Sequence, residues 1–172
     1  MLLIEPTMEY VRRIEDYRRA FLASGESMDG TSSLRRFERV ADWIDYVTAG
    51  KDPETMRTAV PATQYIFVRE ADGKVVGMLQ IRHYFNDYLE KYAGHIGYSV
   101  VPGERRKGYA AQMLAMALPK CRDLGIDRAL VCCLRDNEAS RRTILKNSGV
   151  YESTVYEPEQ GVYLERYWID IP

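Results

Sequence analysis

The feature with the clearest chemistry in this sequence is a basic turn that lies between an apolar run and a helical pattern. Its residues are Arg105, Arg106, Lys107, Gly108, Tyr109 and Ala110. The start of a helix presents unpaired backbone N–H groups and the positive end of the helix dipole, so it favours anions. Gly108 lets a ligand approach the backbone closely, and the three cations add positive charge. The turn therefore predicts a diphosphate site, with a solvated basic turn as the alternative.

Two familiar phosphate loops are absent from the sequence. No Gly-x-x-x-x-Gly-Lys-Ser/Thr stretch occurs, and no Gly-x-Gly-x-x-Gly follows an expected strand. The loops of nucleoside triphosphatases and of dinucleotide-binding folds thus lack their glycines. A diphosphate ligand of another type is expected.

Two amphipathic helices are expected in the first fifty residues. Apolar side chains recur at helical spacing after Thr7, a candidate N-cap, and the pattern continues to about Ala23. A second helical pattern runs from Leu34 to about Gly50. Residues 51–62 contain two prolines and are expected to be irregular.

The rest of the chain alternates strands and helices around the basic turn. The expected strands cover residues 65–69, 74–84, 94–101, 128–134, 150–157 and 162–171. Helices are expected over residues 110–124, where Pro119 should kink or end the regular part, and over residues 137–147. This order predicts a mixed α/β sheet with at least one parallel crossover.

Composition argues for one compact domain over residues 1–172. The chain is 46% hydrophobic and 28% charged, as globular proteins are, and no linker or internal repeat stands out. A formal net charge of −1 argues against a nucleic-acid-binding module. No stretch resembles a secretory signal or approaches membrane-spanning length, so neither export nor membrane contact is expected.

The cysteines agree with a reducing compartment. Cys132 and Cys133 are adjacent and Cys121 stands apart, so the three fit neither a disulfide framework nor zinc-ligand spacing. The adjacent pair is expected to lie in a buried strand rather than to act in redox chemistry. We therefore expect a cytoplasmic protein without a metal site.

At residues 105–110 the chain resembles the GCN5-related N-acetyltransferase (GNAT) superfamily. The hallmark of that family is Gln/Arg-x-x-Gly-x-Gly/Ala at the entry to its central helix, and this turn matches it in full. Residues 137–149 are similar to the family's Asn-x-x-Ala/Ser helix, which ends in glycine. The order of expected elements also matches over nearly the whole chain. The resemblance implies a GNAT-like acyl-CoA N-acyltransferase fold of the α/β (α+β mixed sheet) class, with a central, mostly antiparallel sheet, splayed fourth and fifth strands, and flanking helices.

The resemblance also implies acetyl-coenzyme A as the acyl-donor substrate and assigns residues to it. The backbone of Val100 and Val101 would pair with pantetheine, and residues 105–110 would hold the pyrophosphate. Asn137 would bind the pantetheine arm, with a plain helix N-cap as the alternative. Lys146, in a basic cluster with two neighbouring arginines, would meet the 3′-phosphate, with a solvated helix face as the alternative.

The implied reaction is direct attack of a primary amine on the thioester in a ternary complex. An amine with a pKa of roughly 10.4 is mostly charged at neutral pH, so a base or a water chain must remove its proton. Family members often place a glutamate on the fourth strand. The titratable residues of this strand are instead His95 and Tyr98, which point to opposite faces. The alternatives for these two are a structural histidine and a core aromatic side chain.

The expected acid on the Asn helix is missing. Many relatives carry a general-acid tyrosine seven residues after the asparagine, and Ile144 occupies that place here. Ser140, one turn earlier on the same face, or water would then protonate the leaving thiolate. This departure keeps open another function, that of a coenzyme A-binding sensor or a catalytically inactive relative.

The implied acceptor is a primary amine of a small molecule, a peptide or a protein. In the family the acceptor approaches over the first helical loop and the final hairpin, which here carry Glu26, Asp29, Glu157 and Glu159. An acidic rim favours a cationic amine over a hydroxyl or thiol acceptor. The sequence leaves open whether the chain forms a homodimer.

Overall fold

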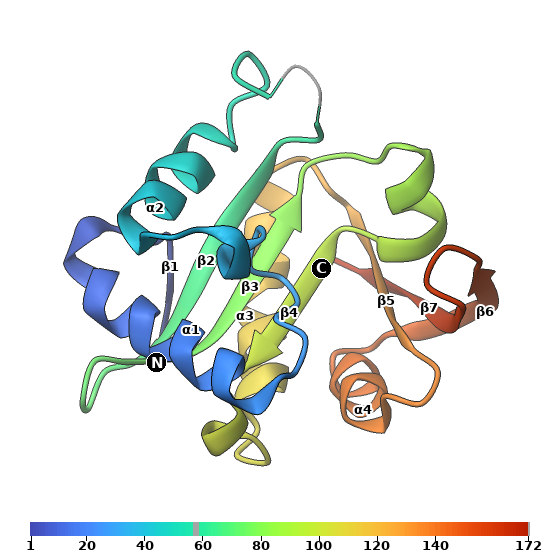
Figure 1. Ribbon diagram of the computed structural model, residues 1–172. Coiled ribbons are helices and arrows are strands. Elements are labelled where there is room, and N and C mark those ends of the chain that lie inside the picture. Colours follow the sequence, from blue (N-terminus) through green and yellow to red (C-terminus); the bar gives the residue numbers. More distant parts are fainter. Residues whose placement is uncertain (57–58, 172) are drawn as a thin grey trace.

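The computed structural model describes residues 1–56 and 59–171 and contains two antiparallel sheets (Figure 1). The first sheet has the strand order β1-β2-β3-β4, and the second has the order β5-β7-β6. The strands of the first sheet are β1 (Leu2–Ile4), β2 (Ala62–Arg69), β3 (Lys74–Arg82) and β4 (Ile96–Val100). Those of the second are β5 (Arg128–Leu134), β6 (Val150–Glu157) and β7 (Val162–Asp170).

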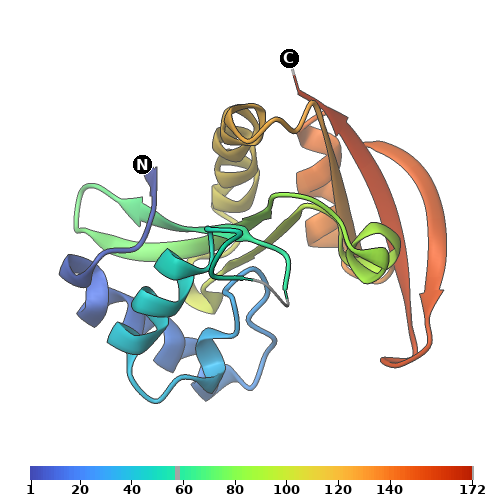
Figure 2. The same ribbon diagram turned by 90° about the horizontal axis from the view of Figure 1, so that it is seen from above.

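Helices lie on both sides of the first sheet. Helices α1 (Val11–Ser24) and α2 (Val40–Ala49) lie on one side, and α3 (Tyr109–Asp123) and α4 (Glu138–Lys146) lie on the other (Figure 2). The chain passes from β4 through α3 to β5, and from β5 through α4 to β6. The basic turn therefore lies in the connection between β4 and α3.

The two sides of the first sheet form separate apolar cores. Trp43 of α2 is fully buried in the core shared with α1, and Leu114 of α3 is fully buried in the other. Strand residues alternate between these cores, because successive side chains point to opposite faces. Ile66 accordingly joins the first core and its neighbour Phe67 the second.

Short helical segments connect the main elements. They are the 3₁₀ helices η1 (Met8–Tyr10), η2 (Leu34–Arg36) and η4 (Pro102–Glu104), and the π-helix η3 (Leu89–Ala93). The second helix was expected to start at Leu34, but α2 starts at Val40. The chain interrupts the helical pattern between them, because Phe37 is extended. Of the segment expected to be irregular, residues 57 and 58 lie outside the described residues.

Strands β4 and β5 touch only at one end. A single bridge joins Gly94 to Val131. Next to it, the N–H of His95 donates to the carbonyl of Leu130 at 2.8 Å. No ladder links the two strands beyond this junction in the described part of the chain, and Figure 1 shows them belonging to different sheets. We call the space between the free edges of β4 and β5 the splay. The splayed strand pair agrees with the expected fold class.

Three local features differ from what the sequence indicated. Strand β1 was not predicted, since an edge strand of three residues carries too little pattern to detect. Pro119 was expected to kink or end the regular part of its helix, and it does not end α3, because the helix continues to Asp123. Pro119 is exposed, so water can satisfy the carbonyl that loses its intrahelical partner. The predicted parallel pairing is also absent from the described residues, where all the ladders are antiparallel.

Three properties of the fold bear on the function. None of the helices within the described residues is long and apolar enough to cross a membrane. Among the same residues, no group of three or more His, Cys, Asp or Glu side chains is arranged to hold a metal ion. Burial raises the pKa of the Cys132 thiol to about 12, which makes it a poor nucleophile.

Candidate active site

The basic turn forms an open cradle of backbone N–H groups. Arg106 and Gly108 both have left-handed backbone conformations, with φ values of 63° and 81°. Helix α3 starts one residue later, at Tyr109, and its first N–H groups have no intrahelical acceptor. Among the described residues, the N–H groups of residues 106–111 find no hydrogen-bond acceptor. A Cβ atom at Gly108 would meet nothing within 4 Å, so an anion has free access to the cradle.

A buried carboxylate at the start of this turn forms ion pairs with three cations. Glu104 is buried and binds Lys74 and Lys107, each at 2.7 Å, and Arg69 at 2.8 Å. These hydrogen bonds hold the pKa of Glu104 well below its usual range. Sequence reasoning missed this cluster, because Arg69 and Lys74 come from the distant β2–β3 hairpin. The side chain of Lys107 is therefore partly neutralised within the protein.

The other side chains of the turn have separate roles. Arg105 donates through Nε to the carbonyl of Val100 at 3.1 Å and pairs with Glu26 at 2.6 Å. It thereby fastens the loop after α1 to the end of β4. Tyr109 accepts a hydrogen bond from Arg69 at 3.3 Å, and Arg106 is exposed. Backbone groups, more than side chains, thus face the expected diphosphate.

Along β4, the backbone groups of successive residues point alternately toward β3 and away from it. The N–H of Arg82 on β3 donates to the carbonyl of His95 at 2.8 Å, and the N–H of Val101 donates to β3 at 3.0 Å. Residues that bond to one neighbour alternate along an antiparallel strand. Tyr98 and Val100 therefore turn their backbone groups away from β3 and toward the splay.

These contacts correct one expectation about pantetheine. The N–H of Val101 is used by β3, and its carbonyl accepts the N–H of Glu104 at 2.9 Å. Both backbone groups of Val101 therefore already have a partner within the protein, and its N–H cannot bind pantetheine. The N–H of Val100 remains open, while its carbonyl is held by Arg105. Tyr98, which was not predicted for this role, is the second residue whose backbone faces the splay.

Helix α4 lies beside the cradle. The side chain of Asn137 accepts the N–H of Ser140 at 3.0 Å, so its alternative role as a helix N-cap is confirmed. At the other end, the side chain of Asn147 donates to the carbonyl of Ala111 at 3.1 Å, which places the last turn of α4 next to the first turn of α3. Lys146 is exposed in that last turn.

The remaining basic residues of α4 are paired within the protein. Arg141 binds Glu138 and, at 3.2 Å, Glu165. Arg142 also binds Glu138, at 2.7 Å. These contacts favour the solvated helix face that was the alternative for both arginines.

Two hydroxyl groups meet between β4 and α4. The side-chain oxygens of Tyr98 and Ser140 lie 2.8 Å apart. Burial raises the pKa of Tyr98 well above its usual value, so the phenol stays neutral at physiological pH. Ile144, at the place of the family's tyrosine, is fully buried and belongs to the core. The hydroxyl group of Tyr98 thus reaches α4 from strand β4.

His95 has the contacts of a structural residue. Its Nδ1 accepts the N–H of Leu130 at 2.9 Å, and its ring packs 4.0 Å from that of Phe85. Burial and the nearby Arg82 cation lower its pKa to about 4. A neutral imidazole that accepts at Nδ1 carries its proton on Nε2, so His95 is a poor base at neutral pH.

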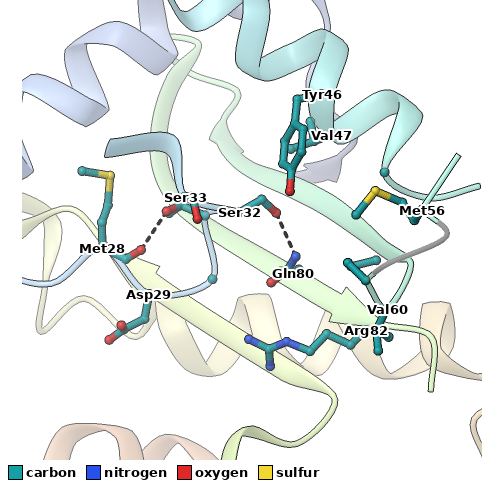
Figure 3. Close-up of a pocket in the computed structure, with 15 residues that line it drawn as sticks. Met28, Asp29, Ser32, Ser33, Tyr46, Val47, Met56, Val60, Gln80 and Arg82 are labelled. Atoms are coloured by element: carbon teal, nitrogen blue, oxygen red, sulfur yellow. Dashed lines mark hydrogen bonds between the residues drawn. The ribbon is translucent and has the colours of Figure 1, made fainter. Parts of the chain in front are cut away.

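A cavity of about 400 Å³ opens on the opposite side of β3 from α3 (Figure 3). The loop after α1 contributes residues 28–33, α2 contributes Tyr46 and Val47, and β3 contributes Gln80 and Arg82. Ser32 links this loop to the sheet, since it accepts a hydrogen bond from Gln80 at 2.8 Å. Sequence reasoning placed only Asp29 of these residues near the acceptor.

The expected acidic rim is smaller than predicted. Glu26 is paired with Arg105, as described above. Glu157 is buried and accepts the N–H groups of Glu159 and Gln160, at 3.1 and 2.6 Å, so it holds the β6–β7 turn. Neither carboxylate is free to attract a cationic acceptor, which leaves Asp29 and Glu159.

Solved structures of known proteins share this fold. Ribosomal-protein-S5-alanine acetyltransferase from Vibrio fischeri has 12% sequence identity and a TM-score of 0.73, over 98% of this chain and 92% of that chain. Microcin C7 self-immunity acetyltransferase, solved with acetyl-CoA and AMP, has 16% identity and a TM-score of 0.69, over 98% and 91%. A putative acetyltransferase from Salmonella typhimurium, solved with acetyl-CoA, has 14% identity and a TM-score of 0.67, over 99% and 94%.

The match to a family is independent of these structures. No curated protein sequence matches the chain significantly. The family model described as the acetyltransferase (GNAT) family matches residues 29–149, well over half of the chain, and includes the cradle and α4. The chain therefore belongs to the acetyltransferase (GNAT) family.

Proposed function

We propose that this protein transfers the acetyl group of acetyl-coenzyme A to a primary amine. The observation that carries the proposal is the continuity between the N–H cradle at residues 106–111 and the open backbone edge of β4. A pyrophosphate and an extended amide chain need these two surfaces in this order. Membership of an acetyltransferase family supports the same activity.

Each part of the cofactor has proposed partners. The pyrophosphate binds the N–H groups of residues 106–111, where the helix dipole and Arg106 add positive charge. The pantetheine amides pair with the N–H of Val100 and the carbonyl of Tyr98 at the splay. Lys146, which lies in the turn of α4 next to the cradle, binds the 3′-phosphate. Asn137 caps α4 and has its amide nitrogen left for the pantetheine arm.

The chemistry proposed is direct attack. The amine nitrogen bonds to the thioester carbon, and the carbonyl oxygen takes up negative charge that the backbone N–H of Tyr98 stabilises. The carbon–sulfur bond then breaks, the coenzyme A thiolate leaves, and the nitrogen loses its extra proton. The hydrogen-bonded hydroxyl pair of Tyr98 and Ser140 has one proton free, and it donates that proton in a hydrogen bond on the thiolate side. The amine proton passes to water or to Asp29, the one carboxylate among the described residues lining the cavity.

Binding of acetyl-coenzyme A to two matched glycine variants tests the proposal. Gly108 and Gly125 stand at opposite ends of α3 and have φ values of 81° and 76°, and a Cβ atom added to either would meet nothing within 4 Å. Valine at either position suffers the same backbone strain. By calorimetry, Gly108→Val should lose at least about ten-fold in affinity because its side chain fills the cradle, whereas Gly125→Val should bind like the wild type. Equal affinities in the two variants would show that acetyl-coenzyme A does not bind at the cradle.

Two observations favour a second candidate, a coenzyme A-binding protein without turnover. His95 is a poor base, and Ile144 replaces the family's acid. Tight binding of acetyl-coenzyme A without release of coenzyme A to any amine would support this candidate. Turnover with a single amine would exclude it.

A further inference from the structure

Arg82, the last residue of β3, is the one cation among the described residues that line the 400 Å³ cavity. Figure 3 shows its side chain reaching past Gln80 toward the side of the cavity where Asp29 lies. Burial lowers the pKa of Arg82, but an arginine stays charged at physiological pH. The cavity therefore holds a positive charge that is partly removed from water, and such a charge favours an anionic partner.

Toward the described residues, the guanidinium group donates hydrogen bonds through one of its three nitrogens. Nη1 donates to the carbonyls of Gly94 at 3.0 Å and Ala93 at 3.4 Å, which fixes the orientation of the group. Among the described residues, Nε and Nη2 have no hydrogen-bond partner and no carboxylate pairs with Arg82. These two nitrogens lie on one edge of the guanidinium plane and form a fixed donor fork.

Two other arginines of this chain show what such a fork binds. Arg69 holds both oxygens of Asp72 through Nε and Nη2, at 3.0 and 2.7 Å. Arg39 holds both oxygens of Asp42 through the same two nitrogens. Two parallel N–H···O bonds are the geometry in which guanidinium groups recognise carboxylates. Arg82 presents the same fork to the cavity.

The fork lies next to the proposed place of acetyl transfer. A Cβ atom built on Gly97 would lie 3.5 Å from Nη2 of Arg82, so the guanidinium group sits against β4 at that residue. Gly97 precedes Tyr98, whose N–H is proposed to bind the thioester oxygen. An acceptor that carries its amine and its carboxylate on the same or on neighbouring carbons can reach both points.

We propose that the acceptor is a primary amine that carries a carboxylate, an amino acid or a close relative, and that Arg82 binds the carboxylate through Nε and Nη2. The inference rests on the proposed acetyl transfer and adds the class of acceptor. The balance is that of the reaction above: a carbon–nitrogen bond forms, the carbon–sulfur bond breaks, the nitrogen loses one proton to water or Asp29, and the released thiolate takes up one proton. An acceptor that carries a carboxylate also agrees with the contacts of Glu26 and Glu157. Both of these carboxylates are bonded within the protein, so neither attracts a cationic acceptor.

Matched acceptors separate the charge from the shape of the substrate. The release of coenzyme A is measured with the full chain for the common L-amino acids, their carboxamides, and simple alkylamines. A charge-assisted bidentate pair should make kcat/KM for the best amino acid about ten-fold to hundred-fold higher than for its carboxamide. Arg82→Gln should reduce the amino acid to the level of the carboxamide, and Arg82→Lys should retain part of the preference.

Controls separate recognition from folding. Arg122→Gln, an exposed arginine of α3, should leave the preference unchanged. Arg82→Gln should bind acetyl-coenzyme A with the affinity of the wild type, because Arg82 lies outside the cradle. If Arg82→Gln fails to fold, two other measurements test the inference. They are the preference of Arg82→Lys and the ratio of kcat/KM for the amino acid to kcat/KM for its carboxamide in the wild type.

The outcomes distinguish this inference from the proposed function. Equal rates for acids and amides, or the same preference in Arg82→Gln and the wild type, would overturn the inference and leave acetyl transfer standing. Absence of turnover with every acceptor would instead overturn the proposed function. Calorimetry with the same acids and amides then decides: the inference requires that the wild type bind the acids more tightly and that Arg82→Gln lose this difference.

Discussion

The hydroxyl oxygens of Tyr98 on β4 and Ser140 on α4 lie 2.8 Å apart, and this hydrogen bond links the first sheet to the helix that follows β5. Tyr98 is also one of the two residues whose backbone faces the splay. Tyr98 thus supplies a neutral phenol next to α4 and an open N–H group at the splay.

The pair predicts a small effect for Ser140→Ala. A serine hydroxyl is a poor acid, and Tyr98 and water remain to protonate a thiolate, so turnover should fall by less than about ten-fold, below the range that general acids usually supply. Steady-state kinetics with acetyl-coenzyme A measure the change, and calorimetry checks that the cofactor still binds. A thousand-fold loss with binding intact would make Ser140 the acid and contradict the prediction.

His95 predicts a pH dependence of stability rather than of turnover. Its pKa is about 4 in the folded protein and roughly 6.5 when unfolded, so the unfolded chain binds more protons between these values. The stability that a neutral His95 provides is complete above pH 6.5 and is lost as the pH falls toward 4. The slope from this residue approaches about 1.4 kcal/mol per pH unit.

Urea unfolding of the wild type and of His95→Gln between pH 7.5 and pH 4.5 tests this prediction. The variant should be less stable at neutral pH, because the buried N–H of Leu130 loses its acceptor, and its stability should depend less on pH. His83 is unchanged in both proteins, so the difference between the two curves belongs to His95. Parallel curves, together with a turnover that titrates with His95, would point to a base instead.

The loop that carries Asp29 depends on a close backbone contact. A Cβ atom on Gly30 would overlap the carbonyl oxygen of Gly97 on β4, and the φ of Gly30 is 67°. Gly30→Ala should push the loop off the strand and lower both the melting temperature and the turnover. Gly25→Ala is the matched control, since Gly25 has a φ of 70° and nothing within 4 Å. Equal effects of the two substitutions on turnover would show that the loop contact is not needed.

The sequence predicted most of the fold because the periodic segments are long. The apolar run of β5, Arg128–Leu134, has the bounds expected from its pattern. Elements without a pattern were missed, as with β1. The start of α2 was misplaced because backbone conformations in the preceding loop override the helical spacing.

The site, like the fold, was predicted from the sequence only in part. Local sequence determines the cradle, because Gly108 and the start of α3 are neighbours in the chain. The support at Glu104, the occupied backbone of Val101 and the cavity around Arg82 depend on contacts between distant segments. No spacing along one element reveals such contacts. Arg82 in particular looks like any arginine at a strand end until the cavity beside it is known.

Mass spectrometry of the reaction products tests the central claim most directly. The full chain is incubated with acetyl-coenzyme A and the panel of amino acids, carboxamides and alkylamines, with Gly125→Val and Gly108→Val as matched variants. We expect one N-acetylated amine per coenzyme A released by the wild type and by Gly125→Val, and a much slower reaction with Gly108→Val. Release of coenzyme A without an acetylated amine, or no release with any acceptor, would contradict acetyl transfer to an amine.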